Sequence, residues 1–275
     1  MIDIINLIKY ENLSALKHCF TTRTGGVSEG GQFSLNLSFS REKSAENVCE
    51  NYKRVADELG VDYYKMTRVP QTHTNHVLKI TEELAGIGIT KPFPQGYSDY
   101  GYDAMITDVP GVVLCTSHAD CVPVLLYDNT HNAVGAVHSG WRGTAEKVSL
   151  KTVERMTLEY NTKPKDLKAV IGPSICIDKF ECDCDVFEAF KTAFDDEFEK
   201  YSCKYIYKKG NKYHISVSGF VYETLLEAGL LPENIFIDKY CTYENDNLFF
   251  SHRRDKGNTG VMAAMISVAP KNSNT

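Results

Sequence analysis

The stretch that decides the fold reads Cys121-Val-Pro-Val-Leu-Leu-Tyr-Asp-Asn-Thr-His-Asn-Ala-Val-Gly-Ala-Val-His138. It contains two short apolar runs, 122–127 and 133–137, whose β-branched residues favour central strands buried on two faces. The polar residues 128–132 between them predict a turn, so the two runs should form an antiparallel hairpin. In such a hairpin the start of the first strand faces the end of the second, which places Cys121 within reach of His138.

Helical and strand patterns alternate on both sides of this hairpin. Short apolar runs at 112–115, 168–172 and 235–237 predict further strands. Helices are predicted after the N-cap Ser44 up to Gly60, from Gly143 to about Tyr160, across 186–198, and at 216–228 and 260–268. The pattern predicts an α/β fold, a single-domain layered α/β sandwich with a mixed sheet at residues 1–269, and a disordered polar tail at 270–275.

Composition narrows the class of protein. The chain has 275 residues, of which 43% are hydrophobic and 24% charged, and a formal net charge of -6. No basic field therefore favours nucleic acid or an anionic membrane, and no apolar run approaches the roughly 20 residues that span a bilayer. The first residues lack the basic start and apolar core of a secretion signal. We expect a soluble, cytoplasmic protein without nucleic-acid or membrane partners.

The chain has nine cysteines, an odd number. A disulfide framework is not expected in a reducing compartment, and the absence of any Cys-x-x-Cys pair argues against a zinc ribbon or a thioredoxin-type motif. Free cysteines are most often small buried hydrophobic residues. We expect eight cysteines to be buried or structural, and Cys121 at the rim of the hairpin to be the exception.

Several histidines and one glycine-containing turn supply candidate chemistry. A thiolate and an imidazole at a strand rim form either two metal ligands or a nucleophile–base pair, and two ordinary residues are the third interpretation. Directly after His138, the turn Gly140-Trp-Arg-Gly143 offers backbone N–H groups and an arginine fork to an anion. A tight strand-to-helix turn is the alternative. Surface or hydrogen-bonded structural positions are predicted for His18, His131 and His214.

Several short strings together resemble one protein family. They occur in a fixed order: His18-Cys-Phe-Thr-Thr-Arg-Thr-Gly-Gly26, Ser34-Leu-Asn36, Gln71-Thr-His-Thr-Asn-His-Val77, Asp103-Ala-Met-Ile-Thr107, Ala119-Asp-Cys-Val-Pro-Val124, Ala136-Val-His-Ser-Gly-Trp-Arg-Gly143, Ile171-Gly-Pro-Ser174, Ser251-His-Arg-Arg-Asp255 and Thr259-Gly260. They are similar to the signature blocks of the YfiH family, also called laccase-domain or multicopper polyphenol oxidase proteins. The resemblance covers residues 18–265 and implies a YfiH-like fold, which is related to cysteine hydrolases of the cytotoxic necrotizing factor type.

The resemblance also implies a metal-dependent enzyme. The family's zinc ligands fall on His73, Cys121 and His138, and three protein ligands leave a fourth position open, as in catalytic zinc sites. The implied activity is phosphorolysis of adenosine, inosine and S-methyl-5′-thioadenosine to the free base and ribose 1-phosphate or its methylthio analogue, with adenosine deaminase activity in the same pocket. The implied partners are purine nucleosides and phosphate, bound by a monomer or homodimer.

Phosphorolysis requires an anion beside the anomeric carbon of ribose. Arg23 and Asn36 lie in the N-terminal family blocks and Arg142 follows the third ligand, so these three are the predicted substrate- and phosphate-binding residues. Further candidates are His252, Arg253 and Arg254, for which a solvated charged turn is the alternative interpretation. Asp103 and Asp120 are predicted either to orient ligand histidines or to cap turns.

Two positions depart from the family pattern. Thr74 stands where the family commonly has glycine, and His76 follows closely. This departure is expected either to alter the mouth of the pocket or to offer a spare ligand. His118 lies where the family varies, and we therefore interpret it as a neighbour of the site rather than a ligand.

Other functions fit parts of the same pattern. A four-copper laccase does not fit, because the chain has only eight histidines and no His-x-His pair. A mononuclear-copper phenol oxidase would use the same three ligands, because imidazole and thiolate bind copper well. A cysteine hydrolase acting on amide bonds of peptidoglycan precursors would use Cys121 as nucleophile and His138 as base. A non-enzymatic binding protein would use the pocket only to sense a ligand.

Overall fold

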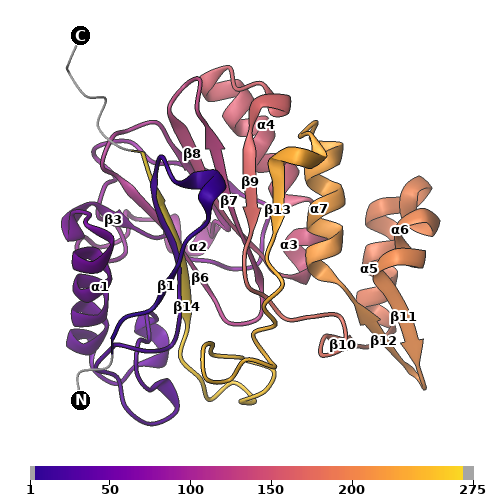
Figure 1. Ribbon diagram of the computed structural model, residues 1–275, viewed down its shortest axis with the longest axis horizontal. Helices are drawn as coiled ribbons and strands as arrows, with labels where there is room; N and C mark the ends of the chain where they lie inside the picture. Colours follow the sequence, from indigo (N-terminus) through magenta and orange to yellow (C-terminus); the bar gives the residue numbers. More distant parts are fainter. Residues whose placement is uncertain (1–3, 269–275) are drawn as a thin grey trace.

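The computed structural model describes residues 4–268, and two large β-sheets packed face to face form its centre (Figure 1). The six-stranded sheet has the spatial order β13 (Ile235–Ile237), β9 (Lys168–Ile171), β7 (Val122–Asp128), β8 (Ala133–Ser139), β5 (Ala104–Thr107) and β4 (Val77–Lys79). The five-stranded sheet has the order β1 (Leu7–Ile8), β2 (Lys17–Thr21), β14 (Met262–Ser267), β6 (Val113–His118) and β3 (Met66–Thr67). Both sheets mix parallel and antiparallel pairs. The predicted tail at 270–275 lies outside the described residues.

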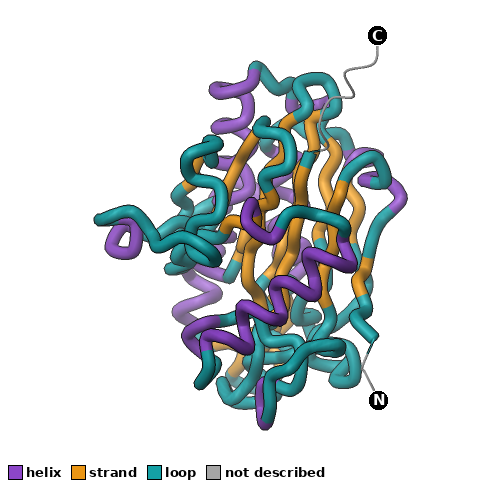
Figure 2. The backbone as a smooth tube through the Cα atoms, turned by 90° about the vertical axis from the view of Figure 1, so that its left-hand side faces the viewer, coloured by secondary structure: helices purple, strands orange, loops and turns teal. Residues whose placement is uncertain are grey.

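Helices cover the outer face of each sheet. On one side lies α1 (Ala45–Leu59), which crosses the strands in front in Figure 2 and ends at Gly60 with a φ of 68°. The other side carries α3 (Trp141–Ala145), α4 (Val148–Tyr160), α5 (Cys184–Phe194), α6 (Phe198–Tyr205) and α7 (Val217–Glu227). A small sheet of β10 (Glu181–Cys182), β12 (Lys212–Ile215) and β11 (Ile206–Lys209) lies beside α5 and α6 at the right of Figure 1, and α2 (Tyr97–Tyr100) is a single turn. Among the described residues, no helix is both long and apolar enough to cross a membrane.

The central hairpin forms as predicted. Strands β7 and β8 are antiparallel, and their register pairs Pro123 with His138. Along β7 the side chains alternate between two cores: Val124 and Leu126 pack in the helix-covered core, whereas Leu125 and Tyr127 pack between the two sheets. Both faces of the strand are therefore buried, which explains its nearly continuous apolar sequence.

Residues 260–268 form a strand where the sequence pattern predicts a helix. Strand β14 is hydrogen-bonded to β2 on one side and β6 on the other. Met265 packs in the core beneath α1, and Ile266 packs between the sheets. Alanine and methionine favour a helix locally, but a short segment buried on two faces satisfies its backbone groups best inside a sheet. The helix prediction is wrong because a short apolar run does not distinguish the two states.

Two predicted helices are each divided in the structure. The stretch after Gly143 is part of α3 and α4, which are separated at Lys147, where φ is 58°. The run 186–198 is divided between α5 and α6 at Asp195, where φ is 25°. Apolar spacing continues across both breaks, so periodicity alone does not reveal them.

We expect Asp128→Asn to destabilise the turn of the hairpin. One carboxylate oxygen of Asp128 accepts the N–H groups of Thr130 and His131 at 2.9 and 3.1 Å, and the other accepts the hydroxyl of Thr162 at 2.6 Å. Burial opposes ionisation, but the hydrogen bonds from Thr162 and His131 outweigh it and lower the pKa of Asp128. The stabilisation is therefore present at neutral pH and is lost as the pH falls below about 4.

Chemical denaturation at pH 7 should show Asp128→Asn to be less stable than wild type by about 2 kcal/mol. The difference should shrink below about pH 4, where the wild-type carboxyl begins to protonate. Asp196→Asn, at an exposed position, is the matched control and should unfold like wild type. Equal stability of Asp128→Asn and wild type at pH 7 would show that these bonds contribute nothing.

Candidate metal and substrate site

Three side chains from separate segments converge on one point. His73 lies in the loop between β3 and β4, Cys121 directly precedes β7, and His138 lies near the end of β8. One ligand atom of each residue lies within 4.8 Å of the others, and Cys121 Sγ is 4.0 Å from His73 Nε2. The hairpin geometry correctly predicts the proximity of Cys121 and His138. The resemblance alone supplied the third residue, and the structure places it beside the other two.

Gly140 keeps open the space in which the three donors meet. It follows the last paired residue of β8 and lies across the hairpin from Cys121. A Cβ atom at position 140 would lie 2.7 Å from His73 Cδ2 and 3.2 Å from Cys121 Sγ. Any side chain here would intrude between the donors, so the close approach requires glycine.

The buried carboxylate of Asp103 holds two of the three donors in place. Its Oδ1 accepts a hydrogen bond from His138 Nδ1 at 2.7 Å, which leaves Nε2 of that ring available as a ligand atom. Its Oδ2 accepts the backbone N–H groups of Thr72 and Thr74 at 3.1 and 2.6 Å. These bonds fix the loop in which His73 has a φ of 63°. The sequence left two roles open for Asp103, orienting a ligand histidine or capping a turn, and these contacts give it the orienting role.

Asp120 has the other role and caps turns. Its carboxylate accepts the hydroxyls of Thr242 and Ser251 at 2.7 and 3.0 Å and the backbone N–H of Arg253 at 2.7 Å. It thereby fastens the segment after β13 beside the neighbouring Cys121.

The site favours a charged thiolate–imidazolium pair when no metal is bound. Burial opposes ionisation of Cys121, but the charge of His138 and hydrogen bonds from His138 and His73 outweigh it and lower the pKa of Cys121 to about 6. Burial also opposes protonation of His138, but the charges of Cys121 and Asp103 and their hydrogen bonds raise its pKa to about 10. A cation bound between the donors would replace the proton that the pair shares.

The donors open onto a cavity of about 660 Å³, a size typical of small-molecule sites. His118 lines it, is only 3% exposed, and has no hydrogen-bond partner for either ring nitrogen among the described residues. Burial and the nearby charge of His138 lower the pKa of His118 to about 3, so its ring is neutral and offers one donor and one acceptor. Trp141 and Phe180 add aromatic surface. This lining suits a flat heterocycle with polar edges.

Basic side chains line another part of the cavity. Arg41, Arg68 and His252 lie there together. Arg41 Nη2 is 3.2 Å from His252 Nδ1, and Arg41 Nη1 is buried without a hydrogen-bond partner among the described residues. Arg68 donates Nε–H to the carbonyl of Gly88 at 2.8 Å and packs over the ring of Phe39. An arginine that lines a cavity and has a guanidinium nitrogen without a partner is suited to binding an anion.

The three predicted anion-binding residues lie outside the cavity lining. Arg23 donates to the backbone carbonyls of Phe33 and Asp246. Asn36 is fully buried, and its amide oxygen accepts two backbone N–H groups. Arg142 is exposed, with its guanidinium 4.1 Å above the ring of the preceding tryptophan. The described residues that line the cavity include none of the three.

Sequence reasoning missed Arg41 and Arg68 because both lie outside the family-like blocks and meet only in the folded chain. Of the further candidates, His252 and Arg253 line the cavity. Arg254 instead pairs with the adjacent Asp255.

The burial of the cysteines differs in part from the sequence expectation. Burial raises the pKa of Cys19 to about 12, as expected for an inert thiol, and Cys115 and Cys182 are buried as well. Cys184 and Cys203 are exposed, which corrects the expectation for these two. Both lie on outer helices, α5 and α6, where one side of each helix faces solvent.

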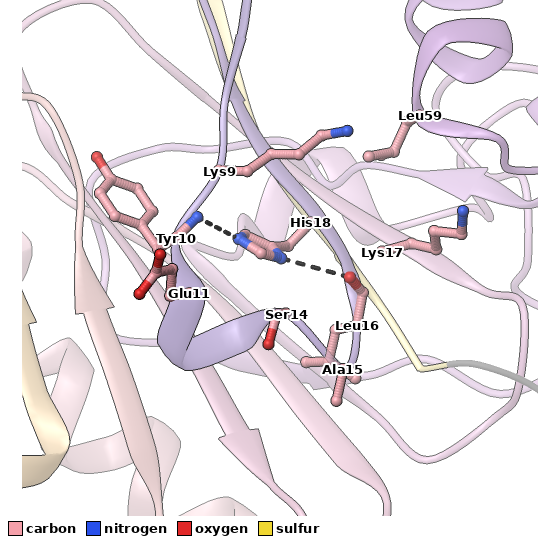
Figure 3. A pocket seen from close by; sticks show the side chains of 9 residues that line it. All are labelled: Lys9, Tyr10, Glu11, Ser14, Ala15, Leu16, Lys17, His18 and Leu59. Carbon is pink, nitrogen blue, oxygen red and sulfur yellow. Dashed lines mark hydrogen bonds between the residues drawn. The ribbon is translucent and has the colours of Figure 1, made fainter.

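A second hollow, of about 430 Å³, lies at the N-terminal β1–β2 hairpin (Figure 3). The His18 ring accepts the N–H of Tyr10 at 2.8 Å, and its other nitrogen lies 3.4 Å from the carbonyl of Leu16. His18 is therefore a hydrogen-bonded structural residue, as predicted.

The fold and the site define an α/β sandwich with a His₂Cys cluster at the rim of its central hairpin. The family described as multi-copper polyphenol oxidoreductase laccase matches residues 17–269, and the chain belongs to this family, the YfiH family. A purine nucleoside phosphorylase of Bacteroides thetaiotaomicron is 35% identical over 254 residues, covering 90% of this chain and 91% of the relative. One of Deinococcus radiodurans is 32% identical, covering 98% and 95%. The crystal structure of hypothetical protein YfiH from Bacillus licheniformis has a TM-score of 0.89 at 30% identity and covers 98% of both chains.

We expect Asp103→Asn to make Cys121 less reactive, because the variant lacks the carboxylate charge that stabilises the protonated form of His138. In wild type freed of metal, alkylation of Cys121 by iodoacetamide should become half-maximal near pH 6, because only the thiolate reacts. The variant leaves the imidazolium without its carboxylate partner, so the midpoint should rise by about one pH unit or more. Peptide mass mapping across a pH series measures it.

The control for this experiment is Asp99→Asn, which removes an exposed carboxylate on α2. It should leave the alkylation midpoint unchanged. The same midpoint in Asp103→Asn and wild type would contradict the role assigned to Asp103.

Proposed function

We propose that this chain is a zinc-dependent purine nucleoside phosphorylase acting on adenosine, inosine and S-methyl-5′-thioadenosine, with adenosine deamination in the same cavity. The proposal rests on the convergence of His73, Cys121 and His138 at a nucleoside-sized cavity in a chain whose relatives are named purine nucleoside phosphorylase. In phosphorolysis a phosphate oxygen bonds to ribose C1′ while the bond from C1′ to the base breaks. The products are the free base and ribose 1-phosphate or its methylthio analogue.

The donor set fits one zinc ion. Two imidazoles and one thiolate are zinc ligands, and three protein donors leave one position for a substrate. Zinc held there would supply Lewis-acid chemistry. Copper is the alternative metal for the same donors. A four-copper centre does not fit, because the described residues provide one histidine-containing cluster.

The cavity divides into a part suited to the base and a part suited to phosphate. The neutral ring of His118 offers a donor and an acceptor to the polar edge of a purine, and Trp141 offers a face for stacking. Arg41, with its unpaired guanidinium nitrogen, and His252 beside it provide charge for phosphate. The proposal therefore places phosphate on this pair, with Arg68 adding further positive charge.

One observation favours a second function, that of a cysteine hydrolase. Cys121, His138 and Asp103 have the order of contacts of a nucleophile, a base and an orienting carboxylate, and the thiol pKa is lowered. In that case Cys121 would attack a carbonyl carbon, and His138 would protonate the leaving amine. A metal held by Cys121 would block this reaction, so metal dependence separates the two functions.

The first test is incubation of the purified protein with adenosine, with and without phosphate, followed by chromatography of adenine, inosine and hypoxanthine. We expect adenine only when phosphate is present, and inosine in both cases. The protein should hold about one zinc per chain. Removal of zinc, or the variant Cys121→Ser, should lower both activities by at least about 100-fold.

Cys203→Ser, which changes an exposed cysteine on α6, is the control and should retain zinc and both activities. Turnover that is insensitive to chelators but abolished by alkylation of Cys121 would exclude the zinc proposal and support the hydrolase. Formation of inosine without any phosphate-dependent formation of adenine would contradict phosphorolysis and leave deamination as the only one of the two proposed activities.

The second test concerns the phosphate pair. Arg41→Gln should raise the KM for phosphate by roughly 10-fold or more and leave the KM for inosine nearly unchanged, because a charge-assisted contact to the anion is lost. Arg142→Gln is a matched control at the exposed arginine that the sequence favoured, and it should have little effect. If Arg142→Gln had the larger effect on the KM for phosphate, the phosphate site would instead lie at Arg142, shortly after β8.

A further inference from the structure

Two cysteines outside the His₂Cys cluster lie in contact. The sulfur atoms of Cys176 and Cys241 are 2.8 Å apart, although 65 positions separate them in the chain. The backbone fixes their approach: Ser174 and Cys241 form an isolated parallel bridge, and the N–H of Cys176 donates to Cys241 Sγ at 3.2 Å. In Figure 1 the segments that carry them are the stretch from β9 to β10 and the gold stretch after β13.

The two sulfur atoms are closer together than two independent thiols would be, and closer than two ligands of one metal ion would be. Non-bonded carbon atoms prefer about 3.5–4.0 Å, and sulfur is larger. Two thiolates on a tetrahedral zinc, each about 2.3 Å from the metal, lie about 3.8 Å apart. Glu244 is near enough to be a third ligand, but it is exposed and lies 3.6 Å from Lys179. The observed 2.8 Å leaves the sulfurs only a small movement from bonding distance.

We propose that Cys176 and Cys241 form a modification site, at which a hydroperoxide converts the two thiols into an intramolecular disulfide. The thiolate of Cys176, the less buried of the two, attacks the outer peroxide oxygen, which yields a sulfenic acid and releases an alcohol, or water from hydrogen peroxide. The sulfur of Cys241 then displaces the sulfenic hydroxyl, which leaves as water. Two thiols and one hydroperoxide thus give one disulfide, one alcohol and one water.

The reaction should be slow at neutral pH and faster in alkali. Burial and the hydrogen bond with Cys241 raise the pKa of Cys176 to about 12, and the thiolate is the attacking form. The pair is therefore suited to slow, lasting oxidation rather than to rapid sensing.

The disulfide would fasten two segments that line the large cavity. Ile175 and Phe180 line it from the first segment, and His252 lines it from the second. Both segments already depend on Asp120, whose carbonyl accepts the N–H of Ile175 and whose carboxylate accepts the hydroxyl of Thr242. A covalent bond here would hold the cavity wall beside Cys121 without consuming that thiol.

The experiment treats the full chain with hydrogen peroxide at pH 8 and then alkylates it in denaturant. Cys176 and Cys241, which are alkylated together with the other seven cysteines in the reduced chain, should no longer be alkylated after oxidation. Tryptic digestion places Cys176 alone in peptide 169–179 and Cys241 alone in peptide 240–253, so their bond appears as one linked mass that dithiothreitol separates. The thermal midpoint of the oxidised protein should be higher by on the order of 5 °C.

Two variants make the outcome decisive. Cys176→Ser should give no linked peptide and no rise in thermal midpoint on oxidation, whereas Cys203→Ser, at an exposed position on α6, should behave like wild type. A linked peptide that joins Cys121 to either partner, or nine alkylated cysteines after oxidation, would overturn the proposal. A second zinc per chain that is lost in Cys176→Ser would show that the pair binds metal instead.

Discussion

The antiparallel ladder between β7 and β8 determines where both the core and the site lie. Because β7 is buried on two faces, it serves the helix-covered core and the core between the sheets at once. Its register also places Cys121 and Gly140 across from one another at the rim. His138 lies two residues before Gly140 and pairs with Pro123. The same hydrogen bonds therefore stabilise the fold and bring the donors together, and a slip by one residue would disrupt both.

The ladder positions two donors, and the carboxylate of Asp103 fixes the loop that carries the third, His73. Asp103 directly precedes β5, which pairs with β8. Its carboxylate accepts hydrogen bonds from His138 on one side and from the His73 loop on the other. The loop itself has little regular structure, and His73 has a left-handed backbone conformation. A buried anion that needs several donors can hold such a loop in place. The geometry of the site thus depends on the hydrogen bonding of one side chain.

The sequence predicted those features that depend on local pattern. Short apolar runs rich in β-branched residues and turn chemistry located the central hairpin, and the hairpin correctly placed Cys121 near His138. The strand β14 was missed because its identity depends on β2 and β6 on either side of it. His252 was a candidate, but its partner Arg41 was missed for the same reason, since 211 positions separate the two residues. Arg23 was chosen from a family-like block, but its guanidinium binds backbone carbonyls.

The cysteines show that surroundings rather than residue type decide the chemistry. In Cys19 burial acts almost alone, and the thiol stays protonated. In Cys121 the effect of burial is outweighed by the imidazolium of His138, and the thiolate is favoured. In Cys176 the nearest group is a second thiol, which adds to the effect of burial. A cationic neighbour favours the thiolate and so suits a buried thiol to act as a ligand or a nucleophile, and a thiol neighbour makes it a partner for oxidation. A count of nine cysteines therefore has no single meaning, and their functions follow from the groups they contact.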